Sequence, residues 1–229
     1  MKVVHIMVGI ICVISLLVVL LISSIDIAVY ADIGYFEKEY KKYNVIEKVD
    51  MQQSDLLFVT KEMMSYLRGK RDNLHIETEI DGRQQEFFNE REIAHMEDVR
   101  ELFWGGQWLR RISIVVGIVT AIYSIVQKQY LFLLKFSRNS MICFVVAVGI
   151  LAGIISSNFT KYFVIFHKIF FNNNLWILNP ETDRLINIVP EPFFVDTSVR
   201  IAVIFFTMIA IVCVICSILL KIGIKKTGV

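Results

Sequence analysis

Two histidines, His95 and His167, are the side chains in this sequence best suited to acid–base chemistry. His167 follows Phe166 in an aromatic segment, where burial would disfavour the imidazolium and leave a neutral base. Asp98 lies three residues after His95, so the two share one face of a helix. A carboxylate in that position can fix the tautomer of an imidazole and support its protonated form. The candidate catalytic residues are therefore His95, His167 and Asp98, and the alternative for each histidine is a structural role.

Signatures of the common enzyme classes are absent from the sequence. It has no GxSxG nucleophile elbow, HExxH zinc motif, Walker loop or dinucleotide fingerprint. Its four cysteines all lie inside apolar runs, which suits packing better than catalysis or disulfide formation. If the protein is an enzyme, the pattern indicates that it lacks a covalent protein nucleophile, and proton transfer between substrate groups by histidine remains possible.

The composition indicates that membrane helices position these residues. Hydrophobic residues make up 55% of the 229 and charged residues only 20%, and the mean hydropathy is +0.59. These values argue against a water-soluble single domain, and the net charge of +2 gives no reason to expect nucleic acid. A bilayer core of about 30 Å requires about 20 apolar residues in a helix. Four runs approach that length: residues 3–25, 112–126, 141–155 and 201–220.

The distribution of basic residues predicts the orientation. Lys2, the segment 128–140 and the tail 221–229 together hold seven Lys or Arg and no acidic residue. Two spans separate each of these segments from the next, so all three lie on one side, and basic short loops face the cytoplasm. We therefore expect both termini inside. The first run could be a signal peptide, but it is longer than the usual apolar core of about 7–15 residues, which favours a retained anchor.

The first outer segment is long enough for a small α+β cap. Capping residues, a tight Asp-Gly turn and alternating apolar positions predict a helix, a hairpin and a second helix there. The first predicted element is a helix over 56–67, capped by Ser54 or Asp55 and ended by Gly69. Strands over 74–80 and 84–88 follow, joined by a turn at Asp81-Gly82. A second helix begins with a capping box of Asn89 and Glu92, runs to about Trp104 and stops at Gly105-Gly106.

Aromatic residues recur at helical spacing in the second outer segment. Such a stripe is typical of a helix lying in the membrane interface, with its rings among the acyl chains; a simple anchoring belt is the alternative. The stripe consists of Phe159, Tyr162, Phe163, Phe166, Phe170 and Phe171.

The candidate substrate-binding residues are aromatic rings and arginines near the outer ends of the spans. The arginines could hold a polar head group or a peptide backbone. Snorkelling or ion pairing, for which Asp26 is available at the same level, is the alternative. The set is Arg110, Arg111, Arg200, Phe166, Phe170 and Trp176.

The predicted fold class is a mainly α membrane protein with four transmembrane helices, a small α+β extracytoplasmic cap and an interfacial aromatic helix. The predicted order is transmembrane helix 1 (1–30), cap (31–107), transmembrane helix 2 (108–127), cytoplasmic loop (128–140), transmembrane helix 3 (141–156), an extracytoplasmic loop with the interfacial helix (157–199), transmembrane helix 4 (200–220) and a cytoplasmic tail (221–229).

The motifs around these residues resemble those of the lipoprotein intramolecular transacylase family, Lit, of bacterial membranes, and the similarity covers nearly the whole chain. The resemblance rests on Tyr66-Leu67-x-Gly69, His95-Met96-x-Asp98-Val99, Phe166-His167-x-x-Phe170-Phe171, Asn174-x-Trp176-x-Leu178-Asn179-Pro180-x-Thr182-Asp183 and Pro190-Glu191-x-Phe193-Phe194.

The resemblance implies an acyltransferase that acts on a diacylated bacterial lipoprotein. Such enzymes move the sn-2 acyl chain of the diacylglyceryl-cysteine to the α-amine of the same cysteine, which gives the lyso-form lipoprotein. Because both groups belong to one molecule, no cofactor is expected. The implied protein is a multi-pass protein of the bacterial cell membrane, in contact with membrane lipid, whose active site lies at the outer leaflet. We expect a monomer.

Two other functions are compatible with parts of the pattern. A non-enzymatic membrane sensor or assembly protein would use the outer cap for recognition and would tolerate replacement of both histidines. A zinc-dependent membrane hydrolase would need His75, His95 and His167 with a carboxylate, although their spacing matches no recognised ligand pattern.

Overall fold

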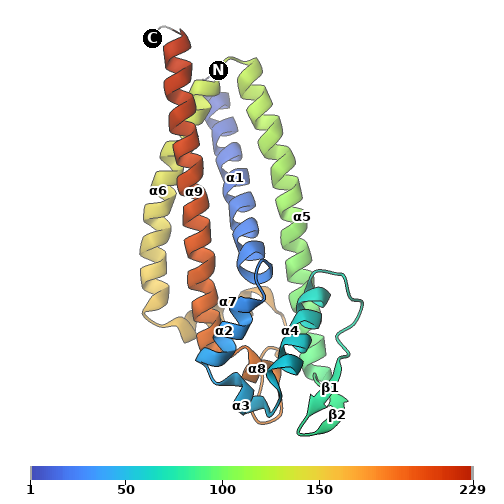
Figure 1. The fold of residues 1–229 in the computed structure, drawn as a ribbon. Coiled ribbons are helices and arrows are strands. Elements are labelled where there is room, and N and C mark those ends of the chain that lie inside the picture. Colours follow the sequence, from blue (N-terminus) through green and yellow to red (C-terminus); the bar gives the residue numbers. More distant parts are fainter. Residues whose placement is uncertain (1, 228–229) are drawn as a thin grey trace. The chain divides into compact units, whose positions relative to one another are not determined.

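A computed structural model describes residues 2–227 of the chain. The predicted tail residues 228–229 and the side chains of Lys2 and Lys226 lie outside the described part. The elements are α1 (Lys2–Tyr30), α2 (Gly34–Lys42), α3 (Val45–Val49), α4 (Gln53–Leu67), β1 (Glu77–Ile80), β2 (Arg83–Glu86), α5 (Glu90–Val126), α6 (Tyr130–Ser156), α7 (Phe159–Phe170), α8 (Leu185–Ile188) and α9 (Glu191–Thr227) (Figure 1).

The chain divides into two compact units. The bundle unit comprises Met1–Asp26, Gly106–Ser157 and Arg200–Val229, and the histidine unit comprises Ile27–Gly105 and Asn158–Val199. Four helices, α1, α5, α6 and α9, are long and apolar enough to cross a membrane. Together with the two-stranded sheet, they confirm the predicted fold class of a mainly α membrane protein.

In the bundle unit, the start of α1, the α5–α6 connection and the end of α9 lie at the same end (Figure 1). Gly223 of α9 packs against Leu131 of α6, and Gly9 of α1 against Phe136. A small buried cluster of Leu20, Met141, Phe205 and Ile209 joins α1, α6 and α9. This arrangement agrees with the expectation that the three basic segments share one side.

Two helices in this unit differ from the prediction. α5 does not stop at Gly105-Gly106 but continues to Val126, and α6 begins at Tyr130, so most of the predicted loop 128–140 is helical. Glycine in a helix costs only about 1 kcal/mol, and a helix entering an apolar environment cannot leave its backbone groups unpaired. At about 1.5 Å per residue α5 is about 55 Å long, which exceeds a bilayer core, so its charged first turns lie outside the apolar section.

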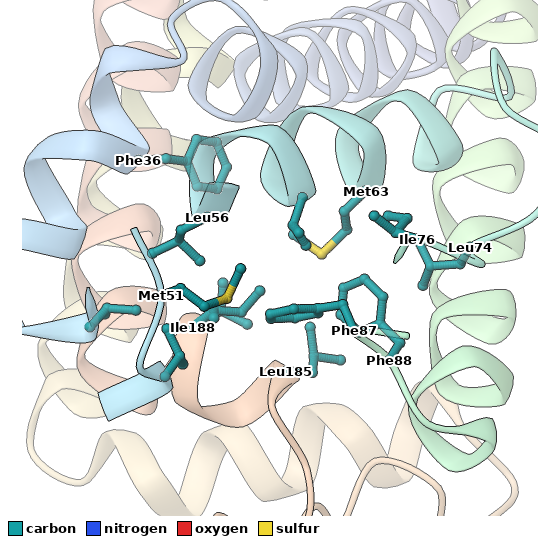
Figure 2. Packing of buried hydrophobic residues seen from close by; sticks show 14 of the residues in the cluster. Phe36, Met51, Leu56, Met63, Leu74, Ile76, Phe87, Phe88, Leu185 and Ile188 are labelled. Atoms are coloured by element: carbon teal, nitrogen blue, oxygen red, sulfur yellow. The ribbon is translucent and has the colours of Figure 1, made fainter. Parts of the chain in front are cut away.

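The histidine unit has its own hydrophobic core. Figure 2 shows side chains from α2, α4, α8 and the segments that flank the hairpin meeting in one cluster. Phe87 and Phe88 at its centre are nearly fully buried and contact each other edge to face, with ring centroids 4.7 Å apart. The labelled members are Phe36, Met51, Leu56, Met63, Leu74, Ile76, Phe87, Phe88, Leu185 and Ile188. No residue of α7 belongs to this cluster in the described part of the chain.

The predicted hairpin is confirmed, with shorter strands. β1 and β2 pair antiparallel, with Glu77 opposite Glu86 and Ile80 opposite Arg83. Asp81 and Gly82 both have positive φ, of 51° and 69°, as the favoured two-residue hairpin turn requires. The apolar residues Leu74 and Ile76 were expected in the first strand. They are buried in the core instead, outside the ladder.

The predicted helix ends are partly confirmed. The capping box at the start of α5 is present: Asn89 N donates to Glu92 Oε2 at 2.7 Å, and Glu92 N donates to Asn89 Oδ1 at 3.0 Å. Gly69, with a φ of +71°, follows the end of α4 as expected. The predicted cap of α4 was wrong, because Gln52 occupies the cap position and no side chain caps the helix.

Candidate active site

His167 is held by the turn of α7 that precedes it. Asn158 caps this helix by accepting a hydrogen bond from Lys161 N at 3.1 Å. One face of α7 exposes Phe166, Ile169 and Phe170, whereas His167 faces inward with only 8% of its surface exposed. The stripe expected from the sequence thus contains two faces, and the histidine lies on the buried one.

The ring of His167 has a defined tautomer. Its Nδ1 donates a hydrogen bond to the carbonyl oxygen of Phe163 at 2.7 Å, so Nε2 carries the lone pair. The indole of Trp176 stacks on the ring with centroids 4.8 Å apart, and Phe163 meets its edge. Burial lowers the pKa of His167, and the bond to Phe163 opposes part of that effect. At neutral pH the ring is therefore a neutral base.

His95 lies opposite His167, on the charged first turns of α5. Its ring centroid is 6.3 Å from that of His167 and 5.3 Å from that of Phe171, and 7% of its surface is exposed. Burial, followed by the charge of His167, lowers the pKa of His95 to about 4, and the charge of Asp98 acts in the opposite direction. Its buried Nδ1 has no hydrogen-bond partner in the described part of the chain. Two neutral imidazoles therefore face each other, one with an unpartnered polar atom.

Asp98 acts on His95 at a distance. Its Oδ2 accepts a hydrogen bond from Asn173 Nδ2 at 2.8 Å, whereas His95 Nδ1 stays unpaired. The expected triad-like bond is thus replaced by a charge effect and by a link to the loop after α7. Asn173 was not predicted from the sequence, although the run of asparagines at 172–174 could have suggested side-chain hydrogen bonds to the main chain.

The proposed substrate-binding residues fall into both units. In the histidine unit, Phe166 contacts His167 at 5.4 Å and Phe170 at 4.8 Å, centroid to centroid, and Trp176 stacks on His167. Phe166 and Trp176 therefore contact His167 directly, and Phe170 contacts Phe166.

The arginines belong to the bundle unit. Arg110 NH1 donates to Asp26 Oδ2 at 2.6 Å, and Gln107 Nε2 donates to Asp26 Oδ1 at 2.8 Å. The guanidinium of Arg111 lies 5.0 Å from the ring centroid of Trp108. Arg200 is half-buried near the start of the apolar section of α9. The ion pair expected as the alternative for Arg110 is present, so Asp26 balances its charge.

Four apolar helices indicate a membrane-integral protein, and its histidine unit contains a buried pair of histidines. The family model of the lipoprotein intramolecular transacylase Lit matches residues 10–194, and the chain belongs to that family. The sequence resemblance is thus confirmed. The protein is an acyltransferase of lipoprotein modification, and lipoproteins are the substrates of the family. The non-enzymatic alternative is therefore wrong.

Solved structures share the fold along the whole chain. The membrane-integral lipoprotein intramolecular transacylase Lit from Bacillus cereus matches with a TM-score of 0.78 and 21% identity, covering 100% of this chain and 99% of that one. Variants of that protein with a histidine-to-alanine or histidine-to-arginine mutation each match with a TM-score of 0.75 and 21% identity over 98% of this chain, covering 96% and 94% of their own. A comparison with curated proteins gave no match.

The zinc-hydrolase alternative gains no support from the geometry. Within residues 2–227, no three His, Cys, Asp or Glu side chains are grouped closely enough to hold a metal ion. His75 lies on the exposed surface near Glu86, with 3.6 Å between its Nδ1 and the carboxylate.

Proposed function

We propose that the protein transfers the sn-2 acyl chain of a diacylglyceryl-cysteine lipoprotein to the α-amine of the same cysteine, with histidine acid–base catalysis. The observation that carries this proposal is the buried pair of neutral imidazoles in a chain of the lipoprotein transacylase family. The reaction needs no protein nucleophile, because the amine attacks the ester directly. This fits a site built from histidines and aromatic rings.

The first step requires a base. An α-amine has a pKa of about 7.7–8 and is partly protonated at neutral pH. His167 Nε2 accepts a proton from the amine as its nitrogen bonds to the ester carbonyl carbon, and the Nδ1 bond to Phe163 keeps that lone pair free. The stacked indole of Trp176 stabilises the imidazolium that forms.

The second step requires a proton donor. The tetrahedral intermediate carries an oxyanion, and a well-placed donor to such a charge contributes about 3–4 kcal/mol. His95, with its unpartnered buried Nδ1, donates there or to the glyceryl oxygen as the ester carbon–oxygen bond breaks. The proton that His167 took from the amine then passes to His95 and replaces the one given to the glyceryl oxygen, so both rings end neutral and the glyceryl group leaves as an alcohol. The exchange of roles between the two histidines is the alternative assignment.

Positioning supplies much of the rate. Both reacting groups belong to one substrate, so holding them in contact converts the transfer into a unimolecular step. The rings of Phe166, Phe170 and Trp176 hold the acyl chains and the glyceryl group at the histidine pair. Arg110, Arg111 and Arg200 are the proposed contacts to polar parts of the lipoprotein.

The proposed setting is the bacterial cell membrane, with the site at the outer leaflet and both termini in the cytoplasm. The basic segments at one end of the bundle unit support this orientation. The exposed face of α7, with Phe166, Ile169 and Phe170, supports contact with membrane lipid. We propose that the enzyme acts as a monomer without a cofactor.

The test is mass spectrometry of the N-terminus of a diacylated lipoprotein after incubation with membranes that contain each variant. His95→Ala and His167→Ala should each abolish the lyso-form product while membrane abundance and melting temperature stay near those of the wild type. His75→Ala is the matched control, because His75 is exposed on the hairpin, and it should retain full activity. Normal N-acylation by both site variants would remove the histidine mechanism.

A further inference from the structure

Asn173 uses three of its polar groups in hydrogen bonds around the histidine pair. Its side-chain Nδ2 donates to Asp98 Oδ2 at 2.8 Å, and its side-chain Oδ1 accepts from Leu175 N at 3.0 Å. Its main-chain oxygen accepts from Trp176 Nε1 at 3.0 Å. A single residue thus joins α5 to the loop that follows α7.

The hydrogen bond from Trp176 Nε1 to Asn173 orients the indole that stacks on His167. The indole plane lies 28° from the imidazole plane, with centroids 4.8 Å apart. An indole ring can rotate about two side-chain torsions, and fixing its N–H selects one orientation. The short loop from Asn173 to Trp176 therefore fixes the orientation of the indole ring on which His167 stacks.

The bond to Asp98 acts on the other side of the pair. Asp98 lies one helical turn after His95, so a link from Asn173 to its carboxylate ties the loop to the turn that carries His95. Arg91, one turn before His95, also donates to the main-chain oxygen of Asn174. The loop is thus joined to α5 on both sides of His95.

We propose that Asn173 is a positioning residue for the acyl transfer, because it ties the turn that carries His95 to the indole on which His167 stacks. This inference rests on the proposed histidine mechanism. Asn173 does not touch the reacting atoms. It fixes the distance between the His95 and His167 rings and their relative orientation. Misplacement by about 1 Å is enough to cost about 100-fold in rate.

The kinetic test compares variants of Asn173 in the full-length enzyme, with a diacylglyceryl-cysteine lipopeptide as substrate. Asn173→Ala should lower kcat about 10- to 100-fold and change KM less than about twofold, because Trp176 is the one proposed substrate contact that Asn173 orients and the others stay in place. Asn172→Ala is the matched control, since Asn172 is the neighbouring residue and its side chain is exposed. This variant should retain wild-type kcat.

A charge-swapped pair separates this role from general support of the fold. Asn173→Asp sets a carboxylate against Asp98 and should be at least as damaging as Asn173→Ala. Combining Asn173→Asp with Asp98→Asn exchanges donor and acceptor, so the hydrogen bond returns with the same total charge. The double variant should recover at least about tenfold of the kcat lost in Asn173→Asp.

A spectroscopic test reports on the ring contact itself. A protonated imidazole quenches an indole stacked on it, so the fluorescence of Trp176 should fall as His167 is protonated. The signal is isolated as the difference between each protein and the same protein with Trp176→Phe. Wild type and Asn172→Ala should show one step in this difference below pH 6.5, whereas Asn173→Ala should lose the step or move its midpoint upward by at least about 0.5 pH unit.

The outcomes distinguish the two proposals. Wild-type kcat in Asn173→Ala, an unchanged fluorescence step, or no recovery in the swapped pair would each overturn the role of Asn173, while inactive His95→Ala and His167→Ala would still support the mechanism. Activity in both histidine variants would refute the mechanism itself. If Asn173→Ala fails to fold, the swapped pair against Asn173→Asp decides the matter alone.

Discussion

The neutral state of His95 predicts how thermal stability changes with pH. In the folded protein burial lowers the pKa of His95 to about 4, whereas an unfolded histidine titrates near 6.5. Between these values the unfolded state binds the proton and the folded state does not. Stability therefore falls as the pH falls from about 6.5 to about 4, and it is unaffected by His95 above that window.

The size of the effect follows from the width of the window. Each pH unit is worth about 1.4 kcal/mol, so His95 alone removes about 3 kcal/mol between pH 6.5 and 4. Because only 7% of His95 is exposed, solvent screening does not reduce this value much. For a chain of this length about 1 kcal/mol shifts the melting temperature by 2–4 °C, which gives a total of about 6–12 °C.

The assay is the melting temperature of detergent-purified protein across this pH range, at one scan rate. His95→Gln should lose about 6–12 °C less than wild type between pH 6.5 and 4, because glutamine takes up no proton. His75→Gln, at an exposed position, should follow the wild-type curve. If His95→Gln and wild type lost the same number of degrees, His95 would not be buried in its neutral form, and the reasoning would fail.

Three further outcomes are expected. The transfer rate should rise from pH 6 to 8 as the substrate amine, of pKa about 7.7–8, loses its proton, and a maximum below pH 6 in a pH–rate profile would contradict a neutral-amine attack. Asp98→Asn should lower the rate about tenfold while membrane abundance stays constant, because an amide oxygen still accepts the bond from Asn173 but lacks the charge; equal losses of rate and abundance would make Asp98 structural. Glu92→Gln should cost about 2 kcal/mol of stability, measured by chemical denaturation, because Glu92 accepts backbone bonds from both Asn89 and Leu185; an unchanged denaturation midpoint would speak against that estimate.

Features with a local physical cause were predictable from the sequence. The apolar runs revealed the four spans, the Asp81-Gly82 pair predicted the hairpin turn, and Asn89 with Glu92 predicted the start of α5. Each depends on residues that are neighbours in the chain. The same reasoning misplaced the end of the helix at Gly105, since a helix ends only where its freed carbonyl groups find other partners.

The histidine pair was predictable in kind but not in detail. Aromatic neighbours indicated a buried, neutral His167, and the structure brings it within 6.3 Å of His95, centroid to centroid. The partner of Asp98 was not predictable, because Asn173 lies 75 residues away and only the tertiary fold brings the two together. A spacing of three residues made a bond between Asp98 and His95 possible, but the folded loop supplied a different donor.

The bond from His167 Nδ1 to Phe163 has a consequence for how the site arises. The acceptor is the main-chain oxygen of a residue four positions earlier in α7. One helical turn therefore determines which ring nitrogen of His167 carries the proton, and no distant carboxylate is needed. The tautomer is therefore set within α7 and does not require the loop that carries Trp176. Substitutions of the Phe163 side chain that preserve the helix should leave the tautomer intact, whereas a kink between Phe163 and His167 would release it.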